Sequence, residues 1–328
     1  MHKIWEKDRL YSFLRPYVDA CTKYSYYKAH VRGSLPEDGA VIIAPNHTST
    51  LMDALVILRT RKKPTVFGAR ADIFKKPAIA KILTFLRILP LARLRDGAQS
   101  VMHNLEVFAI VDDVLDHGVP FCIFPEGRHR PMHSLLPIGK GIARMAFASA
   151  EKRHTYVVPT GIEHGSFFNY RYPSTVTYGE PIDVNEFLKA HEGCSEGKTF
   201  MDFRNELGEK IKGLITYVPD DENYEAAWQA VKPVRKPRKL TAILTAPLFL
   251  LTTILCLPMW VTAEALCRKA QDHAWNNTIR FGVKLVLTPV MLLFWLLVMP
   301  GWWKLLVGVL FLFSYSFFYD WLNLTRED

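Results

Sequence analysis

The sequence predicts an α/β fold, in which a mostly parallel central sheet is flanked by helices and followed by a C-terminal helical membrane-embedded tail. Two patterns predict this fold. Through the first 231 residues, apolar runs of strand length alternate with helical stretches, an order typical of parallel sheets that are covered on both faces. From Lys239 onward, long apolar runs of about bilayer length dominate the chain. We therefore expect a soluble domain joined to a membrane-embedded tail.

Residues 1–31 are expected to form an amphipathic helical region at a membrane interface. Aromatic side chains mix there with lysine and arginine, and Ile4, Leu10, Leu14 and Val18 recur at roughly helical spacing. A helix packed on the soluble core fits the same composition, so both interpretations stay open. Because charges interrupt the first 14 residues, we expect no cleaved signal peptide.

Residues 32–231 are expected to form the α/β domain. Its first strand, residues 40–44, is small and apolar; Pro45 and Asn46 end it, and the hydroxyl residues that follow can cap a helix beginning near Leu51. Further strands are expected at residues 65–68, 120–124, 155–159 and 174–178, and further helices at residues 74–89, 98–116, 139–150 and 200–215.

Residues 232–328 are expected to form a basic linker and C-terminal membrane helices. The linker holds the tightest basic cluster of the chain, directly before the first apolar run: Lys232, Arg235, Lys236, Arg238 and Lys239. Cationic residues beside a membrane segment favour the cytoplasmic side. We therefore expect the α/β domain on the cytoplasmic face of a membrane.

Three apolar runs follow the linker, at residues 240–263, 281–299 and 302–319. Prolines at two positions make the first run a kinked or shallow span. The other two runs meet at Pro300 and Gly301, where either a tight hairpin or one long bent helix fits the sequence. A buried soluble helix bundle is the alternative for the whole tail, which the uniform apolarity of the runs disfavours.

Charge and cysteine usage narrow the class of protein. The formal net charge of +9 fits nucleic acid or an anionic membrane surface, but no zinc-finger spacing or glycine-aromatic strand signature accompanies it. We therefore expect a membrane lipid as partner and no nucleic acid. The five cysteines are scattered singly without metal-ligand spacing, which predicts a reduced compartment and no metal site.

A histidine lies at the turn between the first predicted strand and its helix. In parallel α/β sheets, ligands bind outside the carboxyl ends of the strands, so His47 is expected to face substrate. Asp53, one turn into the helix, can bond one ring nitrogen and leave the other free to take a proton. A simple helix-capping turn with an incidental histidine is the alternative on these residues alone.

Two further charged turns follow elements of the same sheet. Arg93 and Arg95 form one of them, and Glu126, Gly127 and Arg128 follow the strand at residues 120–124. Charges beside buried strands are costly unless they are paired or touch a ligand. Arginine suits an anion, and glycine lets the backbone approach a substrate. The turns together predict a His/Asp base beside an anionic substrate.

An activated nucleophile is not apparent in the sequence. Cys122 lies in the middle of a predicted strand, where cysteine is usually a small core residue. Ser49 lacks the glycine-flanked turn that a hydrolase serine requires.

These motifs resemble the glycerol-phosphate and lysophospholipid acyltransferase family, whose members carry four ordered blocks. Asn46, His47 and Asp53 match the first block, and the other three are matched around residues 90–93, 124–128 and 158–160. The FPEGR sequence at residues 124–128, at the right distance downstream, makes the set specific. The resemblance covers about residues 32–181.

One departure narrows the family. Five residues separate His47 from Asp53, where the common pattern has four, and one residue rotates a helical side chain by about 100°. The two side chains can pair only if the turn absorbs the extra residue before the helix starts. Fungal glycerol-3-phosphate acyltransferases look similar in this respect, and they share the pattern at residues 90–97 and the pair Lys140-Gly141.

The resemblance implies an O-acyltransferase that acts without an acyl-enzyme, with His47 as the base and Asp53 orienting it. The substrate-binding residues that it implies are Arg93 for phosphate, with Arg128 and Lys140 as further candidates, and Glu126 and Gly127 for the glycerol pocket. The partners would be an acyl-CoA or acyl-carrier-protein thioester donor and a glycerol-phosphate-type acceptor, with no cofactor or metal. A non-phosphate acceptor such as an amino-acid lipid, or a non-catalytic lipid-binding protein, remains the alternative.

Overall fold

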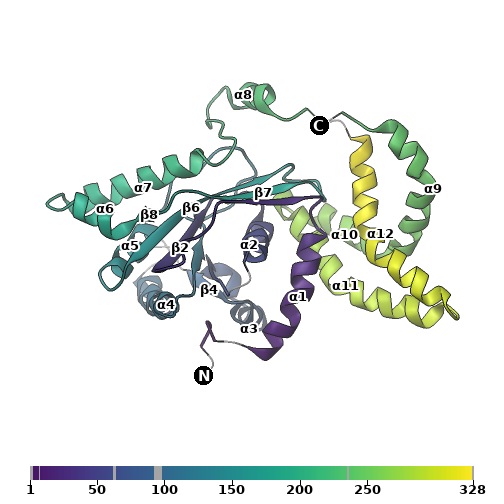
Figure 1. Cartoon of the computed structure of the whole chain (residues 1–328), viewed down its shortest axis with the longest axis horizontal. Helices are drawn as coiled ribbons and strands as arrows, with labels where there is room; N and C mark the ends of the chain where they lie inside the picture. The colour runs from purple at the N-terminus through teal and green to yellow at the C-terminus, as the bar shows by residue number, and fades with distance from the viewer. Residues whose placement is uncertain (1–2, 7, 62–63, 92–97, 235, 327–328) are drawn as a thin grey trace.

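A computed structural model describes residues 3–6, 8–61, 64–91, 98–234 and 236–326. Its eight-stranded sheet has the order β1-β7-β6-β2-β5-β3-β4, with β8 paired to β6 (Figure 1). The strands are β1 (Ala29–Arg32), β2 (Ala40–Pro45), β3 (Val66–Arg70), β4 (Ile88–Leu91), β5 (Phe121–Ile123), β6 (Thr155–His164), β7 (Ser174–Tyr178) and β8 (Ile182–Asp183). Only β7 and β8 pair antiparallel with β6 among the described strands, so the predicted mostly parallel sheet is confirmed.

Strand β2 lies inside the sheet between two parallel neighbours, β5 and β6. Its side chains alternate between two hydrophobic cores: Val41 and Ile43 face one, and Ile42 and Ala44 face the other. All six residues are buried. Because both faces of the strand are covered, its polar neighbours can reach substrate only beyond its carboxyl end.

Helices cover both faces of the sheet. On the side of Val41 and Ile43, the core includes α2 (Thr50–Arg59), with α1 (Arg9–Lys23) packed against it. The opposite core is formed with α4 (Ala98–Asp116), α5 (Lys140–Ala150), α6 (Val184–Ala190) and α7 (Glu196–Lys212). The α/β domain also contains η1 (Ala71–Phe74), α3 (Pro77–Phe85) and α8 (Tyr224–Val231).

The helix predicted over residues 74–89 is wrong at its end. Helix α3 stops at Phe85, and residues 88–91 form strand β4 instead. Arg87 makes the break: its φ is +63°, and its buried guanidinium donates to the carbonyl oxygens of Trp5 and Glu6. The chain then turns back to pair β4 with β3.

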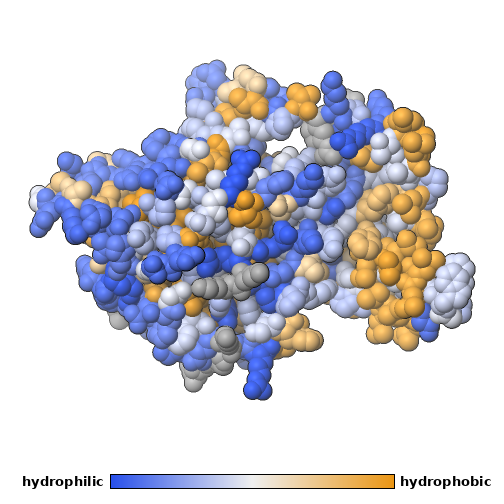
Figure 2. All heavy atoms as spheres, viewed as in Figure 1, coloured by the Kyte–Doolittle hydropathy of each residue, from blue (hydrophilic) through white to orange (hydrophobic). Residues whose placement is uncertain are grey.

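The C-terminal tail consists of α9 (Lys239–Leu255), α10 (Leu257–Lys269), η3 (His273–Trp275), α11 (Asn276–Val298) and α12 (Trp303–Thr325). Two stretches, residues 273–298 and 303–325, are long and apolar enough to cross a membrane, and a third is possible if α9 and α10 count as one span. Helices α9 and α10 are bent by 80° at their junction, in agreement with the kink expected in the first apolar run. Apolar side chains gather over this part of the surface (Figure 2).

The last two helices form a hairpin rather than one bent helix. They pack against each other, and Gly308 of α12 lies beside Leu292 and Leu296 of α11. Gly301, with φ of +52°, lies in the connection between them. The hairpin alternative is therefore the correct one.

The tail and the α/β domain share one continuous hydrophobic core. Met52 and Ile57 of α2 belong to the same cluster as Phe281 of α11 and Tyr315 of α12. The apolar helices are therefore packed against the domain and are not merely attached to its end by the linker.

Helix α1 also contacts the tail, since its Tyr17 hydroxyl donates to the carbonyl oxygen of Leu285 at 2.7 Å. Leu10 and Phe13 remain exposed on another side of the same helix. The packed-helix interpretation thus holds for one side of α1, and contact of the other side with a membrane interface stays a prediction.

Candidate active site

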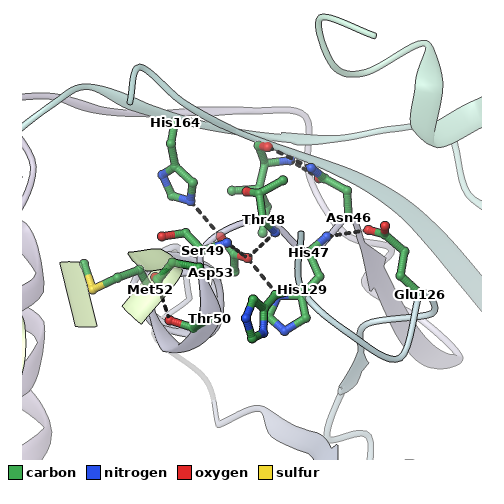
Figure 3. Close-up of polar contacts among 12 residues, drawn as sticks. Asn46, His47, Thr48, Ser49, Thr50, Met52, Asp53, Glu126, His129 and His164 are labelled. Atoms are coloured by element: carbon green, nitrogen blue, oxygen red, sulfur yellow. Dashed lines mark hydrogen bonds and ion pairs between the residues drawn. The ribbon is translucent and has the colours of Figure 1, made fainter. Parts of the chain in front are cut away.

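The turn after β2 is fixed to the neighbouring strand by a buried asparagine. The Asn46 amide nitrogen donates to the carbonyl oxygen of Ile162 at 3.0 Å, and its amide oxygen accepts from the Ile162 backbone nitrogen at 2.6 Å. These two bonds hold the carboxyl end of β2 against β6. His47, the next residue, therefore leaves the sheet from a well-anchored point (Figure 3).

Asp53 is the polar centre of this turn. Its side chain is fully buried, and one carboxylate oxygen accepts from His47 Nδ1 and from the backbone nitrogens of Thr48 and Ser49, each at 2.8 Å. The other oxygen is 2.7 Å from His164 Nε2. Burial by itself raises the pKa of Asp53, but the hydrogen bonds from His164 and His47 hold that pKa below its usual range. The carboxylate is therefore ionised.

An ionised carboxylate fixes the proton positions on the histidine that it binds. Asp53 can only accept, so His47 carries its proton on Nδ1 when the ring is neutral. The Nε2 atom then has a free lone pair, and the His47 side chain is 16% exposed, whereas Asp53 is shielded from solvent. The ring also stacks on Phe124, with centroids 4.1 Å apart. This arrangement can accept a proton from an incoming group at Nε2.

The turn absorbs the extra residue between His47 and Asp53 before α2 begins. Thr48 and Ser49 form a bend whose amides bind Asp53, and the helix starts at Thr50. Thr50 has a φ of +45°, a left-handed conformation that is uncommon for a β-branched residue. The left-handed conformation of Thr50 therefore lets His47 pair with Asp53 even though five residues separate them.

The side chain of Glu126, from the turn after β5, binds the backbone of His47. One carboxylate oxygen accepts from the His47 nitrogen at 2.6 Å, and the other accepts from the Leu136 nitrogen at 2.8 Å. Burial raises the pKa of Glu126 to about 7, against the opposing effect of these two hydrogen bonds. The Arg130 nitrogen also donates to the His47 carbonyl oxygen at 2.9 Å. The second turn thus supports the first from both sides of His47.

Three of the predicted binding residues, Gly127, Arg128 and Lys140, follow β5 and lie outside the hydrogen bonds around Asp53. Gly127, with φ of +68°, and Arg128 are exposed, and so is Lys140 at the start of α5. No hydrogen bond or ion pair joins the Arg128 or Lys140 side chain to another residue that the structure describes. Arg93 and Arg95 lie outside the described residues.

Two histidines in the site were missed by the sequence analysis. His164 ends β6, which is longer than predicted and runs parallel to β2, so its last residue reaches the buried side of Asp53. His129 lies two residues after Gly127, with its ring centroid 5.7 Å from that of His47. A polar residue at the carboxyl end of a parallel strand was the signal for His164, and the adjoining FPEGR motif was the signal for His129.

A groove of about 1050 Å³ lies between the α/β domain, α8, the linker and α12. Aromatic side chains such as Phe167 and Trp228 line it, together with basic ones such as Lys232 and Lys236. None of the predicted site residues is part of its lining. Within the described part of the chain, no cluster of three or more His, Cys, Asp or Glu side chains could hold a metal ion.

The family model named Acyltransferase matches residues 28–163. The match covers less than half of the 328 residues, and it shows that residues 28–163 are similar to the acyltransferase family. The matched range contains β2 with its turn and β5 with its turn, and it ends one residue before His164. Both turns that build the candidate site thus lie in the matched residues, whereas the tail lies outside the match.

Three proteins of known name are similar to parts of this chain. Glycerol-3-phosphate O-acyltransferases 2 and 1 of Saccharomyces cerevisiae are each 30% identical, over 146 and 134 residues, which cover 43% and 40% of this chain. The aligned segments cover only 20% and 17% of the yeast proteins, so the chain spans about a fifth of the length of these relatives. A crystal structure of the 1-acyl-sn-glycerophosphate acyltransferase PlsC from Thermotoga maritima aligns over 70% of this chain and 86% of its own, with 20% identity and a TM-score of 0.46.

Proposed function

We propose that the chain is a glycerolipid O-acyltransferase, which moves a fatty acyl group from acyl-CoA or an acyl-carrier protein to a hydroxyl of glycerol-3-phosphate or 1-acylglycerol-3-phosphate. The observation that carries the proposal is the His47 ring, bound through Nδ1 to a buried, ionised Asp53 and open at Nε2. The names of the relatives support glycerol-phosphate acceptors and acyl transfer.

His47 acts as the general base in this mechanism. Its Nε2 takes the proton of the acceptor hydroxyl while that oxygen attacks the carbonyl carbon of the thioester. The tetrahedral intermediate then breaks its carbon–sulfur bond, and the departing thiolate takes the proton from His47. The products are an ester and a free thiol, so no acyl-enzyme forms and the base is regenerated in each turnover.

Asp53 supports each stage of this proton transfer. Before the reaction it holds the proton of His47 on Nδ1, and during the reaction it stabilises the imidazolium that forms. Its buried position strengthens that stabilisation, because little solvent screens the two charges. His164 binds the far carboxylate oxygen and keeps Asp53 from turning away from His47.

The acceptor phosphate is assigned to three basic side chains: Arg93, Arg128 after β5, and Lys140 at the start of α5. Arg128 and Lys140 are exposed and have no ion-pair partner among the described residues, which leaves their charges available to an anionic substrate. Arg93 remains the first candidate from the sequence.

We predict that Arg93→Ala raises the acceptor KM far more than the thioester KM in steady-state kinetics, since its partner is the phosphate. Equal changes in both would assign Arg93 a structural role instead.

The proposed setting is a membrane, with the catalytic domain on the cytoplasmic face. The two helices of spanning length and the basic linker before α9 support this placement. A lipid acceptor and a long acyl chain would meet the domain at the bilayer surface.

A second acceptor class fits the same base. Arginine binds carboxylate as well as phosphate, so an amino-acid lipid could replace the glycerol phosphate. A third possibility is a lipid-binding protein without turnover, which the intact pairing of His47 with Asp53 opposes.

Acyl transfer to a panel of acceptors separates these possibilities. Purified full-length protein is mixed with a labelled acyl-CoA or acyl-carrier-protein thioester and with glycerol-3-phosphate, 1-acylglycerol-3-phosphate or a hydroxylated amino-acid lipid. We expect labelled ester with a glycerol phosphate acceptor. Labelled ester only with the amino-acid lipid would move the assignment to the second class, and no transfer to any acceptor would contradict the proposed reaction.

A further inference from the structure

The segment that leads into α11 reaches the turn that carries His47. The Thr50 hydroxyl lies 2.6 Å from the hydroxyl of Thr278, and it lies 3.5 Å from the carbonyl oxygen of Ala274. Asp272, just before η3, accepts from His129 Nε2 at 2.8 Å. The tail therefore contacts both turns of the candidate site.

Thr50 combines an unusual backbone conformation with a buried hydroxyl that bonds to the tail. Its left-handed φ of +45° is uncommon for a β-branched residue, yet it lets α2 start after the extra residue and brings Asp53 to His47. Thr50 is also buried, so its hydroxyl must find a partner within the protein. Of its two partners, the Thr278 hydroxyl at 2.6 Å is much nearer than the Ala274 carbonyl oxygen at 3.5 Å.

The start of α11 is itself held firmly on the α/β domain. The Asn277 amide donates to the carbonyl oxygen of Phe167 at 2.9 Å, and the Arg280 guanidinium donates to that of Phe168 at 2.7 Å. Both carbonyls belong to the loop after β6, a few residues beyond His164. Thr278 thus lies between two anchored residues and can act as a fixed support.

We propose that Thr278 is a positioning residue, through which the tail keeps Thr50 left-handed and so keeps His47 paired with Asp53. The inference rests on the proposed function for its kinetic consequence, but its structural part can be measured without any substrate. Under this proposal the tail is a component of the active site as well as an apolar segment, because the helix of spanning length begins with the residues that support the turn.

Backbone hydrogen exchange of the full-length protein in detergent tests the structural part. The amides of Thr48 and Ser49 are protected by their bonds to Asp53, so we expect exchange in peptides covering residues 46–52 to be several-fold faster in Thr278→Val, which keeps the shape and removes the hydroxyl. Thr278→Ser restores the hydroxyl and should restore protection. Unchanged exchange in Thr278→Val would overturn the proposal, and so would faster exchange in β5 and β6 as well, since that pattern indicates general destabilisation.

A matched control comes from the same tail. Thr252 of α9 is buried, and among the described residues its hydroxyl bonds only to carbonyl oxygens of its own helix, those of Leu248 and Phe249. Thr252→Val removes a buried tail hydroxyl that does not touch the turn, so it should leave residues 46–52 protected. Faster exchange there in Thr252→Val would contradict a specific role for Thr278.

Acyl transfer by the same variants tests the kinetic part. We expect Thr278→Val to lower kcat about tenfold with little change in either KM, because a displaced base reacts more slowly while the binding residues stay in place. Thr278→Ser and Thr252→Val should stay near the wild-type rate. Unchanged kcat in Thr278→Val would overturn the inference, whereas absence of transfer by the wild-type protein would contradict the proposed function and leave the exchange experiment to decide the inference.

Discussion

The turns after β2 and β5 follow neighbouring strands of one sheet, and the sequence presents both as charged turns of the same kind. They differ in where their polar groups point. In the β2 turn, the carboxylate of Asp53 is buried and accepts four hydrogen bonds, two from its own turn's backbone and two from histidines. In the β5 turn, Glu126 points back at the His47 backbone while Arg128 stays exposed.

This difference divides the work of the proposed site. The β2 turn presents a proton acceptor, His47 Nε2, and Asp53 holds the ring of His47 in place. The β5 turn fixes the backbone of that acceptor and offers a free positive charge to the substrate. Substitutions in the first turn should therefore abolish the chemical step, and those in the second should weaken positioning or binding.

The largest effect is expected for His47→Ala, which removes the general base. Acyl transfer should fall by about 10²- to 10⁴-fold or more, while circular dichroism and membrane fractionation stay as in the wild type. His154→Ala is a matched control, since His154 is also paired with an aspartate at 2.8 Å, Asp183, but on the surface of the domain. Equal losses in the two variants would assign His47 no special role.

A similarly large loss is expected for Asp53→Asn. The asparagine amide can donate to His47 Nδ1, which then keeps its ring proton on Nε2 and cannot accept one there. The rate should fall by roughly 10²- to 10⁴-fold with little change in KM. A wild-type kcat in this variant would show that the tautomer of His47 is not set by Asp53.

Glu126→Gln should have an intermediate effect on rate. Glutamine can still accept one backbone bond but not two, so the His47 turn loses part of its support, and we expect a loss of about tenfold in kcat. Glu126→Ala, which removes both acceptors, should be slower still. Wild-type kinetics in both variants would mean that the second turn does not support the first.

Glu126→Gln should also change how the stability of the protein depends on pH. The pKa of Glu126 rises from its ordinary 4.5 to about 7 on folding, so the folded state keeps a proton that the unfolded state releases. The stability that this proton contributes is fully present below pH 4.5 and is lost as pH rises through 7. The drop in melting temperature between these pH values should be smaller in Glu126→Gln than in the wild type, and an equal or larger drop would contradict the assignment.

The smallest effect is expected for Arg128→Ala. This exposed side chain has no ion-pair partner among the described residues, so stability should not change. The acceptor KM should rise a few-fold with kcat unchanged, as for a binding charge at the edge of the site. A large fall in kcat instead would place Arg128 at the reacting atoms.

Five of the eight described strands were predictable because their apolar patterns are simple, whereas β1, β4 and β8 were missed. The strand at residues 40–44 and the helix at residues 98–116 lie where the sequence placed them. The strand at residues 88–91 was missed, since its four residues follow a helical pattern without a gap and only the left-handed φ of Arg87 separates the two elements. Local pattern cannot show such a break, because the partners of Arg87 lie some 80 residues away.

In the candidate site, the contact between residues of one turn was predictable, whereas the contacts between different turns and strands were not. Asp53 was paired with His47 from spacing and from the resemblance, whereas His164 is 111 residues away from Asp53 and appears only once β6 lies beside β2. The bond from Glu126 to the backbone of His47 is equally non-local. The support of Thr50 by Thr278 joins positions 228 residues apart, and it depends on how the tail docks on the domain.

Chemical rescue of His47→Ala is the most direct test of general-base catalysis by His47. The variant leaves a space against Phe124 where the imidazole ring was, so added imidazole can take the place of the base beside Asp53. We expect transfer by His47→Ala to increase with the concentration of unprotonated imidazole, while the wild type and Asp53→Asn do not respond. Wild-type rates in His47→Ala without imidazole, or no increase at any imidazole concentration, would contradict general-base catalysis by His47.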